Sequence, residues 1–147
     1  MKTTPCFFED VELNKVYSSP ERIMTDEDIR KFAELSGDFN PLHMDDEFAK
    51  ANIFGQRIAH GLLGLSIASG LKTDEPSYYI LAFKGLEWQF KRPIFIGDKI
   101  HLESKAIEKK EARMPGTGDV QVQRKLINQE GKVTQEGIFT LLVKKKS

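Results

Sequence analysis

The chain has 147 residues, the length of one ordinary domain, and carries 22 basic and 22 acidic side chains, so its formal net charge is zero. That balance argues against nucleic acid or an anionic membrane as a partner, since both are bound through an excess of lysine and arginine. The single cysteine, Cys6, allows neither an intrachain disulfide nor a thiolate metal site, and no apolar run approaches the ~20 residues of a membrane span. With no basic and apolar leader pattern at residues 1–8, we expect a cytoplasmic protein.

The first elements expected are a strand over residues 15–24 and a helix that follows it. Thr25 and Asp28 have the spacing of a capping box, which marks the start of a helix. Apolar side chains then recur at helical spacing, at Ile29, Phe32, Ala33 and Leu35. Gly37 is expected to end this helix, because glycine readily adopts a positive φ.

The next segment is expected to begin as a loop. Pro41 biases Asn40 toward extended geometry, so we expect residues 36–43 to stay out of a helix. Asp45 or Asp46 then suits the N-cap of a second, short helix.

A different kind of helix is predicted over residues 60–71, which contain no charged side chain after His60. A helix that is apolar all round is buried on all sides. Glycine in a helix interior lowers helix stability by about 1 kcal/mol relative to alanine, and this helix contains Gly61, Gly64 and Gly70. We expect close approach of the surrounding backbone to offset that cost.

The remainder of the chain is predicted to form strands. Alternating side chains share one face of each of four strands: Leu86, Trp88 and Phe90; Ile100, Leu102, Ser104 and Ala106; Val120, Val122 and Leu126; Phe139, Leu141 and Val143. Residues 115–119 and 128–131 are the turn signals between them. Such short connections favour an antiparallel sheet. The fold class expected is therefore α+β, one domain over residues 1–147 with the sheet wrapped around the central helix.

Asp38 and His43 are the strongest candidates for acid–base chemistry. Their ordinary pKa values, about 3.9 and 6.5, allow one group to accept a proton while the other donates near neutral pH. Asn40, between them, offers an amide that can hold a side chain or a water. Each residue also has a simpler interpretation, Asp38 as a turn former and His43 as a surface histidine, and their spacing alone leaves the question open.

The start of the central helix is a second candidate. A helix N-terminus presents unpaired N–H groups and a partial positive charge, and Gly61 there lets a substrate carbonyl approach the backbone. A thioester that gains enolate character places negative charge on that carbonyl oxygen, and a donor aimed at it contributes about 3–4 kcal/mol in the transition state. Close packing is the competing explanation for Gly61.

Three segments together resemble one family. Residues 32–43 (FAELSGDFNPLH), 58–61 (IAHG) and 90–98 (FKRPIFIGD) closely resemble the MaoC-like dehydratases, the (R)-specific enoyl-CoA hydratases of hot-dog fold. The resemblance implies an antiparallel sheet around a long central helix, and a homodimer or a larger oligomer of dimers. Residues 25–56 would form a helical overhang that carries the catalytic loop.

The resemblance also implies site residues and a reaction. Asp38 and His43 match the catalytic pair, and Asn40, Gly61 and Ser69 match substrate-binding positions. The reaction implied is reversible syn hydration of a trans-2-enoyl thioester of CoA or acyl-carrier protein to the (R)-3-hydroxyacyl thioester, in fatty-acid or polyhydroxyalkanoate metabolism. No metal or cofactor is implied. We take Asp38 as the base, although a coupled pair titrates as a unit.

Three alternatives stay open. A hot-dog thioesterase would need a carboxylate on or near the central helix, and residues 61–71 have none. A non-catalytic acyl-CoA-binding subunit fits less well, because the Asp38–His43 pair is intact. A metal site is the third alternative, with His43, Asp45, Asp46 and His60 as the possible ligands. The residue types are suitable, but their spacing is not that of metal ligands on one helix.

Overall fold

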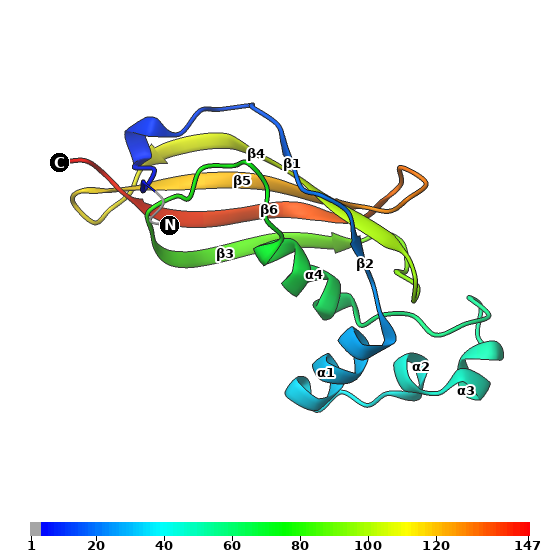
Figure 1. Ribbon diagram of the computed structural model, residues 1–147. Coiled ribbons are helices and arrows are strands. Elements are labelled where there is room, and N and C mark those ends of the chain that lie inside the picture. Colours follow the sequence, from blue (N-terminus) through cyan, green and yellow to red (C-terminus); the bar gives the residue numbers. More distant parts are fainter. Residues whose placement is uncertain (1–3) are drawn as a thin grey trace.

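The computed structural model describes residues 4–147. They form a six-stranded antiparallel sheet and a set of short helices, so the α+β expectation is confirmed (Figure 1). The helical elements are η1 (Phe8–Asp10), α1 (Asp26–Ser36), α2 (Pro41–Met44), α3 (Asp46–Lys50) and α4 (Gly61–Gly70). The strands are β1 (Tyr17–Ser18), β2 (Arg22–Ile23), β3 (Ile80–Phe90), β4 (Lys99–Glu111), β5 (Thr117–Ile127) and β6 (Val133–Lys144).

The sheet follows the order β1-β4-β5-β6-β3, with β2 also paired to β4. The turns before β5 and β6 fall where the sequence predicts them, and Gly116 and Gly131 adopt positive φ angles of 76° and 74° there. The expected inner faces are confirmed for β4, β5 and β6. Their fully or almost fully buried side chains are Ile100, Leu102, Ser104, Ala106, Val120, Val122, Leu126, Phe139, Leu141 and Val143.

The strand expected over residues 15–24 is instead two short strands, both paired to β4. Pro20 lies between them and has no backbone N–H to donate to a ladder, which explains the interruption. Ser19 fills the gap, because its hydroxyl accepts from the Leu102 N–H at 2.8 Å.

The helix α1 begins and ends as its sequence predicts. The Thr25 hydroxyl accepts from the Asp28 N–H at 3.1 Å, and the Asp28 carboxylate accepts from the Thr25 N–H at 3.0 Å. Gly37 ends the helix at φ 82°. The expectation that Pro41 keeps the next residues out of a helix is wrong: Pro41 is the first residue of α2, a position where its missing N–H costs nothing. Asp45 caps α3 as predicted.

The helix α4 packs one face on the sheet, through Leu63, Gly64 and Ala68. The expectation of burial on all sides is wrong for a single chain. Leu62 is 60% exposed and Ser66 is also exposed, since the sheet covers only one side of the helix. Figure 1 shows α4 against the sheet and α1, α2 and α3 beyond its end.

Close approach does explain Gly64, although the neighbour is a side chain and not backbone. A Cβ on Gly64 would lie 2.2 Å from Nε2 of Gln135, a buried residue of β6. Gly70, by contrast, has nothing within 4 Å of its would-be Cβ.

Strand β3 forms one edge of the sheet, at the opposite end of the strand order from β1. Its exposed apolar side chains are Ile80, Leu81, Phe83, Leu86 and Phe90. Among the described residues, no helix has the length and apolar character needed to cross a membrane.

Candidate active site

Asp38 and His43 meet in space, and a third side chain joins them. Asp38 follows α1, His43 lies in α2, and His60 is the residue just before α4. One potential ligand atom of each lies within 4.8 Å of the others. The end of α1, the helix α2 and the start of α4 therefore each contribute one side chain to the cluster. Figure 1 shows α1 and α2 near one end of α4.

Local turns shape the Asp38 loop. The Asp38 N–H donates to the Ser36 hydroxyl at 3.1 Å, and the Asp38 carboxylate accepts from the Asn40 N–H at 3.1 Å. The Asn40 side-chain oxygen accepts from the Leu42 N–H at 3.0 Å and so caps α2. The oxygen of Asn40, predicted from the resemblance to bind substrate, thus holds the start of the helix that carries His43.

The orientation of the His43 ring is fixed by a backbone carbonyl. Its Nδ1 lies 2.8 Å from the Ile58 oxygen. A carbonyl oxygen only accepts, so Nδ1 carries the proton and Nε2 of a neutral His43 is an acceptor. The Arg57 Nε–H donates to the His43 carbonyl at 2.7 Å and fixes the backbone as well.

Arg57 is a supporting residue that the sequence analysis does not identify. Its side chain is only 6% exposed and forms ion pairs with Asp26 of α1 and, at 3.6 Å, with Asp46 of α3. One guanidinium thus joins α1, the end of α2 and the start of α3. No local pattern marks it, because its partners lie far away in the sequence.

His60, which the sequence offers only as a possible metal ligand, is the second supporting residue. It is 2% exposed, and its ring stacks on that of His43 with centroids 4.0 Å apart. Its Nε2 lies 2.9 Å from the Asp38 carbonyl oxygen, and Phe32 meets its ring edge-on. Burial lowers the pKa of His60, the bond to Asp38 opposes that shift, and the neighbouring His43 adds to it.

The N-terminus of α4 lies beside this cluster. The Leu63 and Gly64 N–H groups both donate to the His60 carbonyl, at 3.1 and 3.2 Å. The Gly61 N–H has no acceptor within residues 4–147, as expected for the first turn of a helix. A Cβ on Gly61 would lie 3.0 Å from the Phe90 ring, so this position also has little room for a side chain.

His43 and Gly61 line the same pocket, which has a volume of about 290 Å³. Its apolar walls come from Phe54, Ile58, Ala59, Phe90, Pro93 and Ile94. Lys91, Arg92 and Gln135 add polar groups. A titratable imidazole and a helix N-terminus therefore face one partly apolar space, a combination that suits a thioester.

Ser69 lies elsewhere. It is at the C-terminal end of α4, its hydroxyl donates to the Ser66 carbonyl at 2.6 Å, and it lines a different cavity of about 600 Å³ together with Arg124. Arg124 donates to the Ala68 and Ser69 carbonyls, at 3.1 and 3.0 Å, and pairs with Glu75, whose side chain is 8% exposed. The structure does not bring Ser69 to the acid–base cluster.

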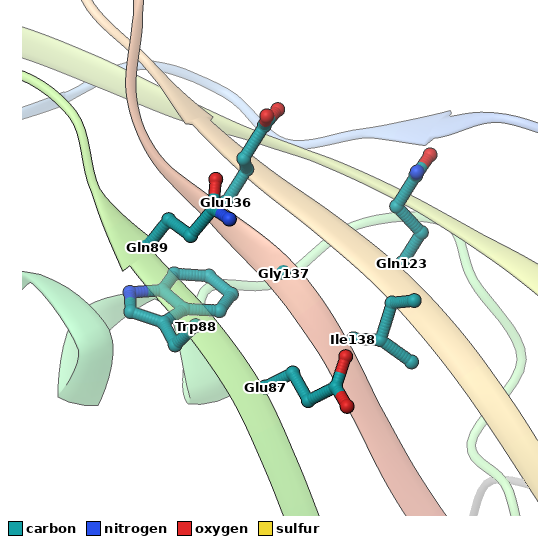
Figure 2. Close-up of a pocket in the computed structure, with 7 residues that line it drawn as sticks. All are labelled: Glu87, Trp88, Gln89, Gln123, Glu136, Gly137 and Ile138. Atoms are coloured by element: carbon teal, nitrogen blue, oxygen red, sulfur yellow. The ribbon is translucent and has the colours of Figure 1, made fainter.

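A further pocket of about 190 Å³ lies across β3, β5 and β6 around Gly137 (Figure 2). Glu87, Gln123 and Glu136 line it, with Trp88 and Ile138, and no residue predicted for the site is among its lining residues.

The metal set considered from the sequence does not assemble. Asp45 accepts from two N–H groups as the cap of α3, and Asp46 pairs with Arg57. The residues close enough together are Asp38, His43 and His60. Each of these histidines uses one ring nitrogen for a backbone carbonyl.

Comparison with known proteins decides the family. A model of the MaoC-like domain matches residues 9–129. The chain belongs to the MaoC-like dehydratase family. It shares with that family the hot-dog fold, in which an antiparallel sheet packs against a central helix. The family names point to a hydratase or dehydratase.

The relatives that carry such names include the following two enzymes. The (R)-specific enoyl-CoA hydratase of Aeromonas caviae is 40% identical over 76 residues, 52% of this chain and 57% of that protein. The 3-hydroxybutyryl-CoA dehydratase of Methylorubrum extorquens is 31% identical over 121 residues, 78% of this chain and 74% of that protein. The matched part of this MaoC-like chain thus spans little more than half of the Aeromonas enzyme.

A solved structure matches almost throughout. It is described as a monoamine oxidase regulatory protein from Archaeoglobus, is 36% identical, covers 97% of each chain and has a TM-score of 0.90.

Proposed function

We propose that this MaoC-like chain catalyses reversible hydration of a trans-2-enoyl thioester to the (R)-3-hydroxyacyl thioester. One observation carries the proposal: His43, which is clustered with Asp38, lines the same pocket as the Gly61 end of α4. Hydration needs both parts, because a proton is moved while negative charge develops on the thioester oxygen.

The thioester carbonyl oxygen accepts from the Gly61 N–H, and the positive end of the α4 dipole favours the charge that collects there. Asp38 and the Nε2 of His43 hold the attacking water. Asp38 removes a proton from that water as its oxygen bonds to C3. A proton reaches C2 either from a His43 that is protonated at Nε2 and is then restored by the proton held on Asp38, or from Asp38 by way of the same water. In both cases the elements of water add across the double bond and the two side chains return to their starting states. Dehydration uses the same groups in reverse.

Supporting roles follow from position. Asn40 holds α2, and thereby His43, in place, and Ser69 borders the space at the far end of α4. Lys91 and Arg92 at the pocket fit the phosphate groups of either CoA or an acyl-carrier protein.

The protein supplies both proton transfer and carbonyl activation, so we propose that no metal or other cofactor takes part. EDTA should leave the hydration rate unchanged.

We propose that the chain acts as a homodimer paired through β3. This strand has an unpaired edge and carries Leu81 and Leu86, which are 46% and 43% exposed. An apolar edge strand has unpaired backbone N–H and C=O groups that can pair with another strand. Strand β3 of a second copy can pair with them in a symmetric dimer. Zero net charge adds no long-range repulsion between copies.

The test is an assay with crotonyl-CoA in which enoyl absorbance and free thiol are followed together. The proposal predicts that absorbance falls without thiol release, and that chiral analysis finds the (R)-3-hydroxy product. Thiol release in step with the loss of absorbance would instead identify a thioesterase. Binding without any chemical change would identify a non-catalytic subunit.

A further inference from the structure

His60 contacts both members of the proposed acid–base pair. Its Nε2 lies 2.9 Å from the Asp38 carbonyl oxygen, and its ring lies flat against the ring of His43 at a centroid distance of 4.0 Å. The other hydrogen bonds of Asp38 in the described chain reach only Ser36 and Asn40. The bond to His60 is therefore what joins the Asp38 loop to α4.

The hydrogen bond fixes the tautomer of His60. The Asp38 carbonyl only accepts, so Nε2 must carry a hydrogen and a neutral ring leaves Nδ1 bare. Nδ1 is buried and has no hydrogen-bond partner within residues 4–147. Protonation would add a buried N–H without an acceptor, which is costly.

The surroundings of His60 favour the same neutral state. The groups that face its ring are Phe32 from α1, Asp38 from the loop and His43 from α2. Burial is the main cause that lowers the pKa of His60, and the nearby His43 lowers it further against the opposing influence of Asp38. His60 is thus suited to hold its neighbours in place, and not to exchange protons itself.

We propose that His60 is a positioning residue for the reaction, a permanently neutral imidazole that anchors the Asp38 backbone and supports the His43 ring. This inference rests on the proposed hydratase function. The His43 ring is held between the Ile58 carbonyl at its edge and the His60 ring on its face. Loss of the His60 N–H frees the Asp38 loop, whose carboxylate is exposed, while the pocket and the Gly61 N–H remain.

Two substitutions separate the contributions of the bond and the ring. His60→Gln keeps an N–H near the Nε2 position, whereas His60→Phe keeps a flat ring over His43 and removes the donor. We expect His60→Phe to lower kcat for crotonyl-CoA by about 10–100-fold, because misplacement of a reacting group by about 1 Å has an effect of that size. KM should change little, since thioester binding is untouched. His60→Gln should recover most of the lost kcat, and His101→Gln, at the remaining histidine of the chain, should match the wild type.

A second measurement does not depend on activity. Long-range 1H–15N spectra of wild-type protein resolve the three histidines, and His60 should show the neutral Nε2–H form at about pH 6, where much of an ordinary histidine is protonated. A doubly protonated or Nδ1–H His60 would overturn the inference, as would full kcat in a folded His60→Phe. If wild-type protein does not hydrate crotonyl-CoA, the proposed function fails, and the spectra alone then decide whether His60 is the neutral anchor.

Discussion

The side-chain amide of Gln135 donates to the carbonyl of Gly61 at 3.1 Å. The oxygen of the same amide accepts from the Trp88 indole N–H at 2.9 Å, and Gln135 is 2% exposed. One buried side chain of β6 thus fastens the first residue of α4 to the sheet. The residue proposed to bind the thioester oxygen is held by the sheet as well as by its own helix.

Gln135→Leu should lower the free energy of unfolding by about 2 kcal/mol or more. The substitution leaves the half-buried Trp88 N–H without its acceptor and removes the side-chain bond that ties the Gly61 carbonyl to the sheet, and an unpaired polar group costs about 1–3 kcal/mol. Urea denaturation measures the loss. Gln123→Leu on β5 is the matched control, since no side-chain hydrogen bond of Gln123 is found within residues 4–147. Equal stability of the two variants would show that the Gln135 bonds contribute nothing.

Gly64→Ala and Gly70→Ala should have opposite effects. At Gly64 the new methyl group would lie 2.2 Å from the Gln135 amide nitrogen, so Gln135 must move and stability should fall by about 2 kcal/mol. At Gly70 the methyl group meets nothing within 4 Å, and the gain in helix propensity should add about 0.5 kcal/mol. Thermal melts of the two variants provide the comparison, and a rise in Tm for Gly64→Ala would contradict the packing account.

The sequence predicts most of the fold because its signals are local. The Thr25–Asp28 capping box, Gly37 at the end of α1 and the glycine turns before β5 and β6 each act within a few residues. Strand alternation likewise predicts which side chains of β4 face the core, because one buried face imposes a period of two.

The rest depends on contacts between distant residues. The sequence marks His60 as the start of a helix and as a candidate metal ligand, and its place against His43 and Asp38 comes from how α1 and α2 pack. Pro41 was misread because a proline that breaks a helix and a proline that begins one have the same local signature. The exposure of Leu62 on α4 could not be predicted, because a helix without charged side chains has no polar face to indicate which side meets solvent.

Asp28→Asn should destabilise the protein near pH 7 and have little effect in acid. Burial raises the pKa of Asp28, but hydrogen bonds from Arg22 and Thr25 outweigh burial and lower it overall. A lowered pKa gives stability that is present above the unfolded value of about 3.9 and is lost as the pH falls through the folded value. The Tm difference from wild type, about 3 °C at pH 7, should therefore shrink at about pH 2.5. Glu27→Gln, at an exposed neighbouring residue, is the control and should show no such dependence of the Tm difference on pH. If the Tm difference between Asp28→Asn and wild type were the same at pH 7 and at pH 2.5, the Asp28 carboxylate would not be the source of the stability.

Leu81→Lys and Leu86→Lys should dissociate the proposed dimer. Each places a charge on the free edge strand, where pairing with a second copy would bury it. Leu35→Lys is the control, because Leu35 is 84% exposed on α1, away from β3. Sedimentation velocity should give twice the mass of one chain for the wild type and the control, and a single-chain mass for the two β3 variants. A wild-type protein that sediments as one chain would end the β3 proposal.

The central claim is that Asp38 and His43 perform the proton chemistry of hydration. The most direct measurement is kcat for crotonyl-CoA in Asp38→Asn and His43→Ala, with folding checked by circular dichroism and with Asp74→Asn and His101→Ala as matched controls outside the cluster. We predict a loss of at least about 100-fold in each site variant and wild-type rates in both controls. Near-normal kcat in either folded site variant would contradict the assignment.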